Sequence, residues 1–167
     1  MVKISNLKYR PGVGAVLFNA QGKVWVGRRV SKQDNKPSHF WQMPQGGMDK
    51  GETPEEAVYR ELEEETGTSK AEIITETTEW LTYDLPKGLA KRSWNGKFVG
   101  QRQKWFAMKF TGTDDDFDLN SHKKPEFSDW RWENIQDLPD LIVPFKRQMY
   151  EAIVKEFIHI PEKVSAS

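Results

Sequence analysis

A strongly acidic helix with recognisable boundaries is the feature that most constrains how this chain folds. Thr53 is a typical N-cap residue, Pro54 stands at the first helical position, and Glu56 completes a capping box. Gly67 follows the last turn, where glycine commonly ends a helix in the left-handed conformation. These signals predict one helix from about Pro54 to Thr66.

This helix carries the run Arg60-Glu61-Leu62-Glu63-Glu64-Glu65. At about 100° per residue, Glu61, Glu64 and Glu65 fall on one face of the helix, whereas Glu63 points largely away. Three carboxylates on one face repel one another, and a hard divalent cation such as Mg²⁺ or Mn²⁺ would neutralise them while substrate phosphates complete its shell. Taken alone, such a cluster is more often a solvated acidic face.

The segment before the helix changes that interpretation, because it places three glycines where backbone can approach an ion closely. It reads Trp41-Gln42-Met43-Pro44-Gln45-Gly46-Gly47-Met48-Asp49-Lys50-Gly51-Glu52. Together, the segment and the helix resemble the Nudix box over residues 46–68. The matching residues are Gly46, Glu52, Arg60, Glu61, Leu62, Glu64, Glu65 and Gly67. The last position, usually aliphatic, departs from the pattern and is Thr68.

The resemblance implies an α/β/α sandwich around a central mixed β-sheet, of the α+β class, and a single domain over residues 1–167. It also implies that Glu61, Glu64 and Glu65 bind the catalytic metal, and that the backbone carbonyl of Gly46 adds a ligand. By the resemblance, the expected metal is Mg²⁺, for which Mn²⁺ or another divalent cation can substitute. Family enzymes hydrolyse a nucleoside diphosphate linked to another group, with metals that bridge phosphate oxygens and activate a water.

Glu52 and Arg60 are matching positions of the same pattern. By the resemblance they form a structural pair that fixes the loop against the helix. The other interpretation of these two residues is an ordinary surface ion pair.

Hydrophobic patterning predicts further strands and a second helix. The β-favouring runs are 12–18, 23–27, 73–80, 104–110 and 130–132, and a hairpin signal at 19–22 joins the first two. An amphipathic helix lying on the sheet is predicted by apolar residues that recur every four positions, namely Phe145, Met149, Ile153 and Phe157. The polar segments 85–99 and 111–124, which carry glycine or aspartate clusters, are predicted to be loops.

Segments outside the box resemble one branch of the family, which contains RNA pyrophosphohydrolases and asymmetrically cleaving dinucleoside tetraphosphate hydrolases. These segments are Tyr9 to Gly14, Trp41 to Gly47, Gly100 to Phe106, Lys124 to Phe127, Trp130 to Trp132, and Pro144 to Arg147. By this resemblance, Glu126 is a further metal ligand or a general base. Without the resemblance, Glu126 would be interpreted as a solvated loop residue.

A polyphosphate must be held by cations and hydrogen-bond donors. The residues that can supply them are Arg10, Arg29, Gln101, Lys104 and Lys146. Taken singly, each of them is more often a surface residue. Tyr83 and Phe145 are candidates to contact or stack on a base, although Phe145 also begins the apolar stripe of the last helix and suits the core equally well.

Composition excludes several classes of protein. With 25 Lys and Arg against 25 Asp and Glu, the net charge is zero, so a polyanion must be held by local charge. No apolar run approaches the ~20 residues needed to cross a bilayer. No signal-peptide pattern begins the sequence, and the chain has no cysteine. We therefore expect no membrane span, no thiolate or disulfide chemistry, and a location in the reducing cytoplasm.

The leading hypothesis is a Mg²⁺-dependent pyrophosphohydrolase that acts on 5′-triphosphorylated RNA ends, on dinucleoside polyphosphates, or on both. Attack by water would release a nucleoside or RNA 5′-monophosphate together with pyrophosphate or a nucleoside triphosphate. One alternative is a Nudix hydrolase of a nucleotide sugar or an oxidised nucleoside triphosphate. Another is a non-catalytic nucleotide-binding module on the same fold. RNA ends and dinucleotides both present a polyphosphate joined to a base and a ribose, so both remain candidates.

Overall fold

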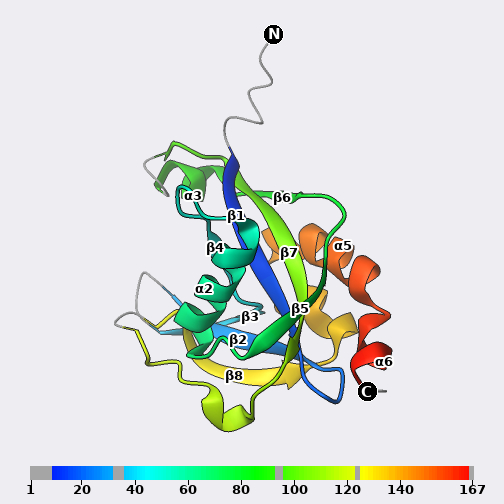
Figure 1. The fold of residues 1–167 in the computed structure, drawn as a ribbon. Coiled ribbons are helices and arrows are strands. Elements are labelled where there is room, and N and C mark those ends of the chain that lie inside the picture. Colours follow the sequence, from blue (N-terminus) through cyan, green and yellow to red (C-terminus); the bar gives the residue numbers. More distant parts are fainter. Residues whose placement is uncertain (1–8, 32–35, 93–95, 123–124, 166–167) are drawn as a thin grey trace.

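A mixed β-sheet forms the centre of the computed structural model, which describes residues 9–31, 36–92, 96–122 and 125–165 (Figure 1). The strands within these residues are β1 (Tyr9–Phe18), β2 (Val24–Val30), β3 (Pro37–Gln42), β4 (Gln45–Gly47), β5 (Ala71–Glu76), β6 (Leu81–Asp84), β7 (Gly100–Phe110) and β8 (Phe127–Glu133). The helices are α2 (Pro54–Thr66), α3 (Lys87–Arg92), α4 (Leu138–Leu141), α5 (Arg147–Phe157) and α6 (Ile160–Ser165). Single 3₁₀ turns are η2 (Asp114–Asp116), η3 (Ile135–Asp137) and η4 (Pro144–Lys146).

Two long parallel strands, β1 and β7, lie at the middle of this sheet and pair from Tyr9 opposite Gly100 to Phe18 opposite Lys109. The main path of the sheet is β3-β2-β1-β7-β5, and β4, β6 and β8 pair with β1, β7 and β2 respectively. All of these other pairings are antiparallel. The predicted mixed sheet is therefore confirmed.

Helices cover both faces of the sheet, because successive strand residues point to opposite sides. On one face, α2 buries Ala57, Val58 and Leu62 in a core cluster shared with β1 and β7. On the other face, α5 contributes to a second core cluster its buried residues Met149, Tyr150, Ile153 and Phe157. Figure 1 shows these two helices on either side of the sheet, so the expected α/β/α arrangement is confirmed.

The boundaries predicted for the acidic helix are those of α2. The backbone N–H of Glu56 donates to Thr53 Oγ1 at 3.2 Å, and the backbone N–H of Thr53 donates to Glu56 Oε1 at 2.9 Å. Both halves of the capping box are therefore present. At the other end Gly67 has a φ of 88°, a left-handed conformation that favours glycine, and its N–H donates to the carbonyl of Glu63.

The hairpin between β1 and β2 is also confirmed, since Phe18 lies opposite Val24. The predicted strand over 73–80 is wrong beyond Glu76, because the chain bends at residues 78–79 and leaves the extended conformation there. Strand β6 begins only at Leu81 and was not predicted. Strand β3 was not predicted either: only Gln42 among its six residues is buried, and the strand lacks the alternation that marks a half-buried strand.

A helix occupies part of the predicted loop 85–99, of which residues 93–95 lie outside the described ranges. This helix is α3, and the N–H of Ala90 donates to the carbonyl of Pro86 at 2.9 Å near its start. Pro86 directly precedes the helix, where its missing N–H costs no hydrogen bond within the helix. The predicted loop 111–124 is irregular apart from η2 over residues 111–122, and residues 123–124 lie outside the described ranges. The apolar stripe of the last helix lies in η4 and α5. Among the described residues, none of the helices combines the length and apolar composition needed to span a bilayer.

Candidate active site

The glycine-containing segment and α2 meet because β4 is hydrogen-bonded to β1. Gly46 lies opposite Val13, and Gly47 lies opposite Gly12. This pairing brings Gly46 so close to α2 that a Cβ atom there would overlap the carboxylate of Glu61. Glycine at position 46 is thus required sterically for the carboxylate to lie against the backbone.

Arg60 joins this segment to α2 through several hydrogen bonds. Its Nε donates to Glu52 Oε2 at 2.7 Å and its Nη2 donates to Glu52 Oε1 at 2.9 Å and to the carbonyl of Gly47 at 2.8 Å. The Glu52 side chain is only 14 % exposed, and the hydrogen bond from Arg60 lowers its pKa below the ordinary value. The structure therefore contains the predicted pair as a bidentate, largely sheltered contact rather than an open surface one.

A cavity of about 420 Å³ gathers most of the residues expected at the site. Its acidic lining residues are Glu61, Glu64 and Glu65 of α2 and Glu126, which directly precedes β8. Its basic lining residues are Arg10 of β1, Arg29 of β2 and Lys146 of η4. Gly46, Tyr83, Gln101 and Phe145 complete the set of predicted residues that border it. The cavity thus places carboxylates and cations within one space.

Burial makes ionisation of two of the carboxylates unfavourable. It raises the pKa of Glu61 to about 6, a shift that the hydrogen bond from Arg60 opposes. The pKa of Glu65 is raised well above its usual range by burial first and then by the charges of Glu126 and Glu61. A hydrogen bond that Glu65 Oε1 accepts from the backbone N–H of Gln45 at 3.1 Å counteracts part of this cost. A positive charge in the cavity would stabilise both carboxylates in their ionised form.

The donor set fits a hard divalent cation, which prefers carboxylate and carbonyl oxygens. In the conformation that the described residues adopt, however, no three acidic or histidine side chains are already gathered as a ligand set. Instead, Arg60 Nη1 donates to Glu61 at 2.8 Å and to Glu64 at 3.2 Å, and Arg29 Nη1 donates to Glu126 at 2.6 Å. Arginines thus neutralise three of the four carboxylates, and binding of a cation would require these side chains to rearrange.

Of the residues predicted to hold a base, Tyr83 is buried and only 6 % exposed, and burial raises its pKa. Its ring centroid lies 5.9 Å from that of Phe145, and Lys146 Nζ lies 5.0 Å from the Tyr83 ring centroid. Phe145 is half-buried: it packs against the core cluster that contains α5 and also borders the cavity. Its environment therefore combines the two that were considered, the core and the site.

Lys104 is the predicted site residue that the structure does not bring to the cavity. Its ammonium group lies 3.5 Å from Glu76 Oε2 and donates to the carbonyl of Thr78 at 3.4 Å. Along β7, Gln101 and Gln103 share one face and Lys104 lies on the other, because side chains alternate in a strand. The structure therefore places Lys104 beside Glu76 and Thr78 and not among the residues that border the cavity, where it was expected.

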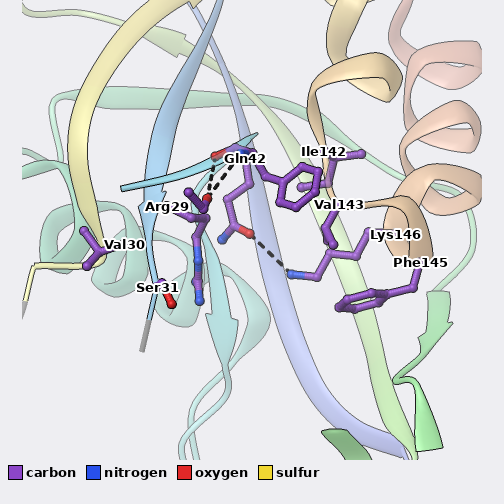
Figure 2. Close-up of a pocket in the computed structure, with 10 residues that line it drawn as sticks. Arg29, Val30, Ser31, Gln42, Ile142, Val143, Phe145 and Lys146 are labelled. Carbon is purple, nitrogen blue, oxygen red and sulfur yellow. Dashed lines mark hydrogen bonds between the residues drawn. The ribbon is translucent and has the colours of Figure 1, made fainter. Parts of the chain in front are cut away.

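Several residues that border the cavities were not predicted. Gln45, Leu85 and Leu89 border the cavity of the carboxylates. Gln42 borders an adjacent cavity of about 240 Å³, which shares Arg29, Phe145 and Lys146 with the first. Figure 2 shows Lys146 reaching toward Gln42, whose Oε1 accepts a hydrogen bond from Lys146 Nζ at 3.3 Å. In the sequence, the glutamines could have been found from their position just before Gly46 and Gly47. No sequence pattern marked the two leucines.

A mixed sheet between helices, with a cavity that joins acidic and basic side chains, defines a class of hydrolases that act on phosphoric anhydrides. The chain belongs to the Nudix family, because residues 8–153 match the NUDIX domain. It is a Nudix hydrolase, and its relatives support pyrophosphohydrolase activity.

Two curated relatives of similar length are RNA pyrophosphohydrolases. The chain is 52 % identical to an RNA pyrophosphohydrolase of Afipia carboxidovorans over 160 residues, which cover 94 % of this chain and 96 % of the relative. It is 45 % identical to an RNA pyrophosphohydrolase of Wolbachia pipientis over 153 residues, with 92 % and 91 % covered. A crystal structure of a C. elegans Ap4A hydrolase is similar in fold, with a TM-score of 0.62, 18 % identity, and 89 % and 98 % covered.

The raised pKa of Glu61 leads to a prediction about the metal-free protein. Because burial raises this pKa from 4.5 to about 6, the folded state binds the proton more tightly than the unfolded state. The contribution of Glu61 to the free energy of unfolding is therefore complete below the unfolded pKa and is lost as pH rises through the folded pKa. As pH rises from below 4.5 to above about 6, we expect the free energy of unfolding of wild type to fall by about 2 kcal/mol relative to that of Glu61→Gln.

Urea unfolding in the presence of a chelator, at a series of pH values, measures this difference. The stability gain of Glu61→Gln over wild type should increase as pH rises. Parallel stability curves for the two proteins would contradict the prediction.

Proposed function

We propose that this chain is a Mg²⁺-dependent RNA 5′-pyrophosphohydrolase. The observation that carries the proposal is the cavity that joins Glu61, Glu64, Glu65 and Glu126 to Arg10, Arg29 and Lys146. Identity near 50 % to curated RNA pyrophosphohydrolases over most of the chain supports the choice of substrate. The cysteine-free composition favours a cytoplasmic location for the reaction.

The residues of this cavity divide into two roles. Glu61, Glu64 and Glu65, with the carbonyl of Gly46 and with Glu126, would hold Mg²⁺. When bound, this cation would offset negative charge on the phosphates and favour ionisation of a water. Arg10, Arg29 and Lys146 would bind the phosphate oxygens and orient the chain of phosphorus atoms. Water would form a new P–O bond as the anhydride P–O bond breaks, leaving an RNA 5′-monophosphate and pyrophosphate.

The adjacent cavity of about 240 Å³ offers space for a nucleobase beside the phosphates. Gln42 is 2 % exposed, and among the residues that the structure describes its Nε2 finds no hydrogen-bond partner. A base with an acceptor atom would satisfy this buried donor. Phe145 and Arg29 border both cavities, so they can contact a base and its phosphates at once.

Dinucleoside polyphosphates are the second candidate substrates, and a third cavity favours them. This cavity of about 270 Å³ is bordered by Tyr9, Asp84 and Gln148, and it shares Tyr83 and Phe145 with neighbouring cavities. A substrate with a nucleoside at each end could place one on either side of Phe145. Hydrolysis of diadenosine tetraphosphate would then be off-centre and yield ATP and AMP.

A substrate comparison tests the proposed function. At the same Mg²⁺ and salt concentrations, we expect kcat/KM to be higher for 5′-triphosphate RNA than for diadenosine tetraphosphate. In ¹⁸O-labelled water, mass spectrometry should find the label in a phosphate-containing product. Preferred hydrolysis of a nucleotide sugar or an oxidised nucleoside triphosphate would support the alternative within the family, and two ADP molecules from the dinucleotide would exclude off-centre attack.

Substitution of Glu64 by Gln is expected to lower kcat/KM by about 100-fold or more, because it removes charge from the proposed metal site while it preserves side-chain size. Glu63→Gln is the matched control, since it removes the same charge from the same helix at a side chain that pairs instead with His122 Nε2 at 3.1 Å. Steady-state kinetics and circular dichroism of both variants measure the effect. Equal activity of the two variants would refute the assignment of Glu64.

Comparison of Arg29→Ala with Lys104→Ala tests whether the polyphosphate is bound in the cavity, because each variant removes one positive charge and only Arg29 borders the cavity. Arg29 borders the cavity, whereas the Lys104 ammonium lies beside Glu76 and Thr78. We expect Arg29→Ala to weaken the binding of a non-hydrolysable nucleotide by about tenfold, and Lys104→Ala to leave it unchanged. Isothermal titration calorimetry measures both affinities. Equal losses of affinity in the two variants would contradict a specific role of Arg29 and would show that the positive charges attract the nucleotide only at long range.

A further inference from the structure

A row of amide side chains connects the buried core to the cavity of the carboxylates. Trp105 and Gln103 are fully buried, Gln101 is 4 % exposed, and all three lie on the same face of β7. On the other side of β1, Gln45 of β4 lies opposite Gly14, which itself lies opposite Trp105. A Cβ atom on Gly14 would overlap the Trp105 indole, so this glycine opens the space through which the side chains of β7 and β4 meet.

The hydrogen bonds of this row fix the direction of each amide. Trp105 Nε1 can only donate, so the Gln103 atom that it contacts at 3.0 Å must be the carbonyl oxygen. The amide nitrogen of Gln103 therefore points the other way. It donates to Gln45 Oε1 and, at 2.7 Å, to Gln101 Oε1. Its two N–H bonds match its two acceptors.

The same logic continues to the cavity. Because Gln45 and Gln101 both turn their oxygens toward Gln103, their amide nitrogens must point elsewhere. Both residues border the cavity of the carboxylates. Within the ranges that the structure describes, neither of these two nitrogens makes a hydrogen bond with the protein. Two amide nitrogens, each with two N–H bonds, are thus left for a ligand rich in acceptor oxygens.

We propose that Gln103, held by the indole of Trp105, is a positioning residue that makes Gln45 and Gln101 present their amide nitrogens to the substrate polyphosphate. This inference rests on the proposed function, and it explains why Gln45 and Gln101 turn N–H groups rather than carbonyl oxygens toward the substrate. An inverted amide would place its carbonyl oxygen against phosphate oxygens, where two acceptors repel each other. Without the indole N–H, a glutamine has no intrinsic preference between its two orientations, since its oxygen and nitrogen ends are similar in size.

Gln103→Glu tests the proposal because it reverses the polarity and retains the shape. A carboxylate at position 103 still accepts from Trp105 Nε1, but its other oxygen can only accept from Gln45 and Gln101. Both amides would then turn their carbonyl oxygens toward the cavity. With 5′-triphosphate RNA we expect KM to rise at least tenfold and kcat to fall less than threefold, since a ground-state contact is lost.

Thr77→Val is the matched control. Thr77 is fully buried, and its Oγ1 accepts from the backbone N–H of Trp105 at 3.2 Å, so the substitution removes a buried hydrogen bond beside the row without touching its amides. We expect Thr77→Val to lower Tm and to leave KM within twofold of wild type. An equal rise of KM in this control would overturn the proposal, because loosening of β7 alone would then explain the effect.

Gln103→Met extends the test if the glutamate variant does not fold. It removes the orienting bonds without adding a charge, and we expect KM to rise several-fold. Unchanged KM in a folded Gln103→Glu variant, or in Gln103→Met if the first variant is unfolded, would overturn the proposal. If wild type hydrolyses none of the phosphoanhydride substrates, the proposed function fails first. A wild type that is active while the position 103 variants keep its KM refutes only the role of Gln103.

Discussion

The contact between Arg60 and the glycine-containing segment is the interaction on which the site depends. One guanidinium binds the carboxylate of Glu52, the carbonyl of Gly47 and the acidic face of α2. It therefore does two things at once. It fixes β4 against the helix, and it offsets part of the repulsion between carboxylates that the helix forces together.

The acidic cluster lowers the stability of the metal-free fold, and its surroundings limit that cost. Arg60 pairs with Glu61 and Glu64, Arg29 pairs with Glu126, and the N–H of Gln45 donates to Glu65. The same burial that raises the pKa values of Glu61 and Glu65 excludes water, which strengthens any interaction with a bound cation or phosphate. Stability and binding strength are thus opposed at these residues.

Elements with local signals were predicted correctly, and those that depend on distant partners were not. The caps of α2, the hairpin turn between β1 and β2, and the apolar stripe of α5 all involve residues close in sequence. By contrast, β3 has a weak pattern of its own and exists because it pairs with β2. Lys104 was misplaced for a related reason, since its side chain faces Glu76 and Thr78, which turn back against β7 only in the folded structure.

The same distinction between local and distant contacts explains which parts of the candidate site could be predicted from the sequence. Of the residues proposed for the metal, all but Glu126 lie in one segment, residues 46–68. One motif was therefore enough to indicate the chemistry. The residues that would recognise the rest of the substrate come from β1, β2, β3, β6, η4 and β7. The contact between Gln42 and Lys146 alone joins positions 104 residues apart. A fold shared with an Ap4A hydrolase at 18 % identity therefore leaves substrate choice open. That choice depends on side chains that only the folded sheet brings together.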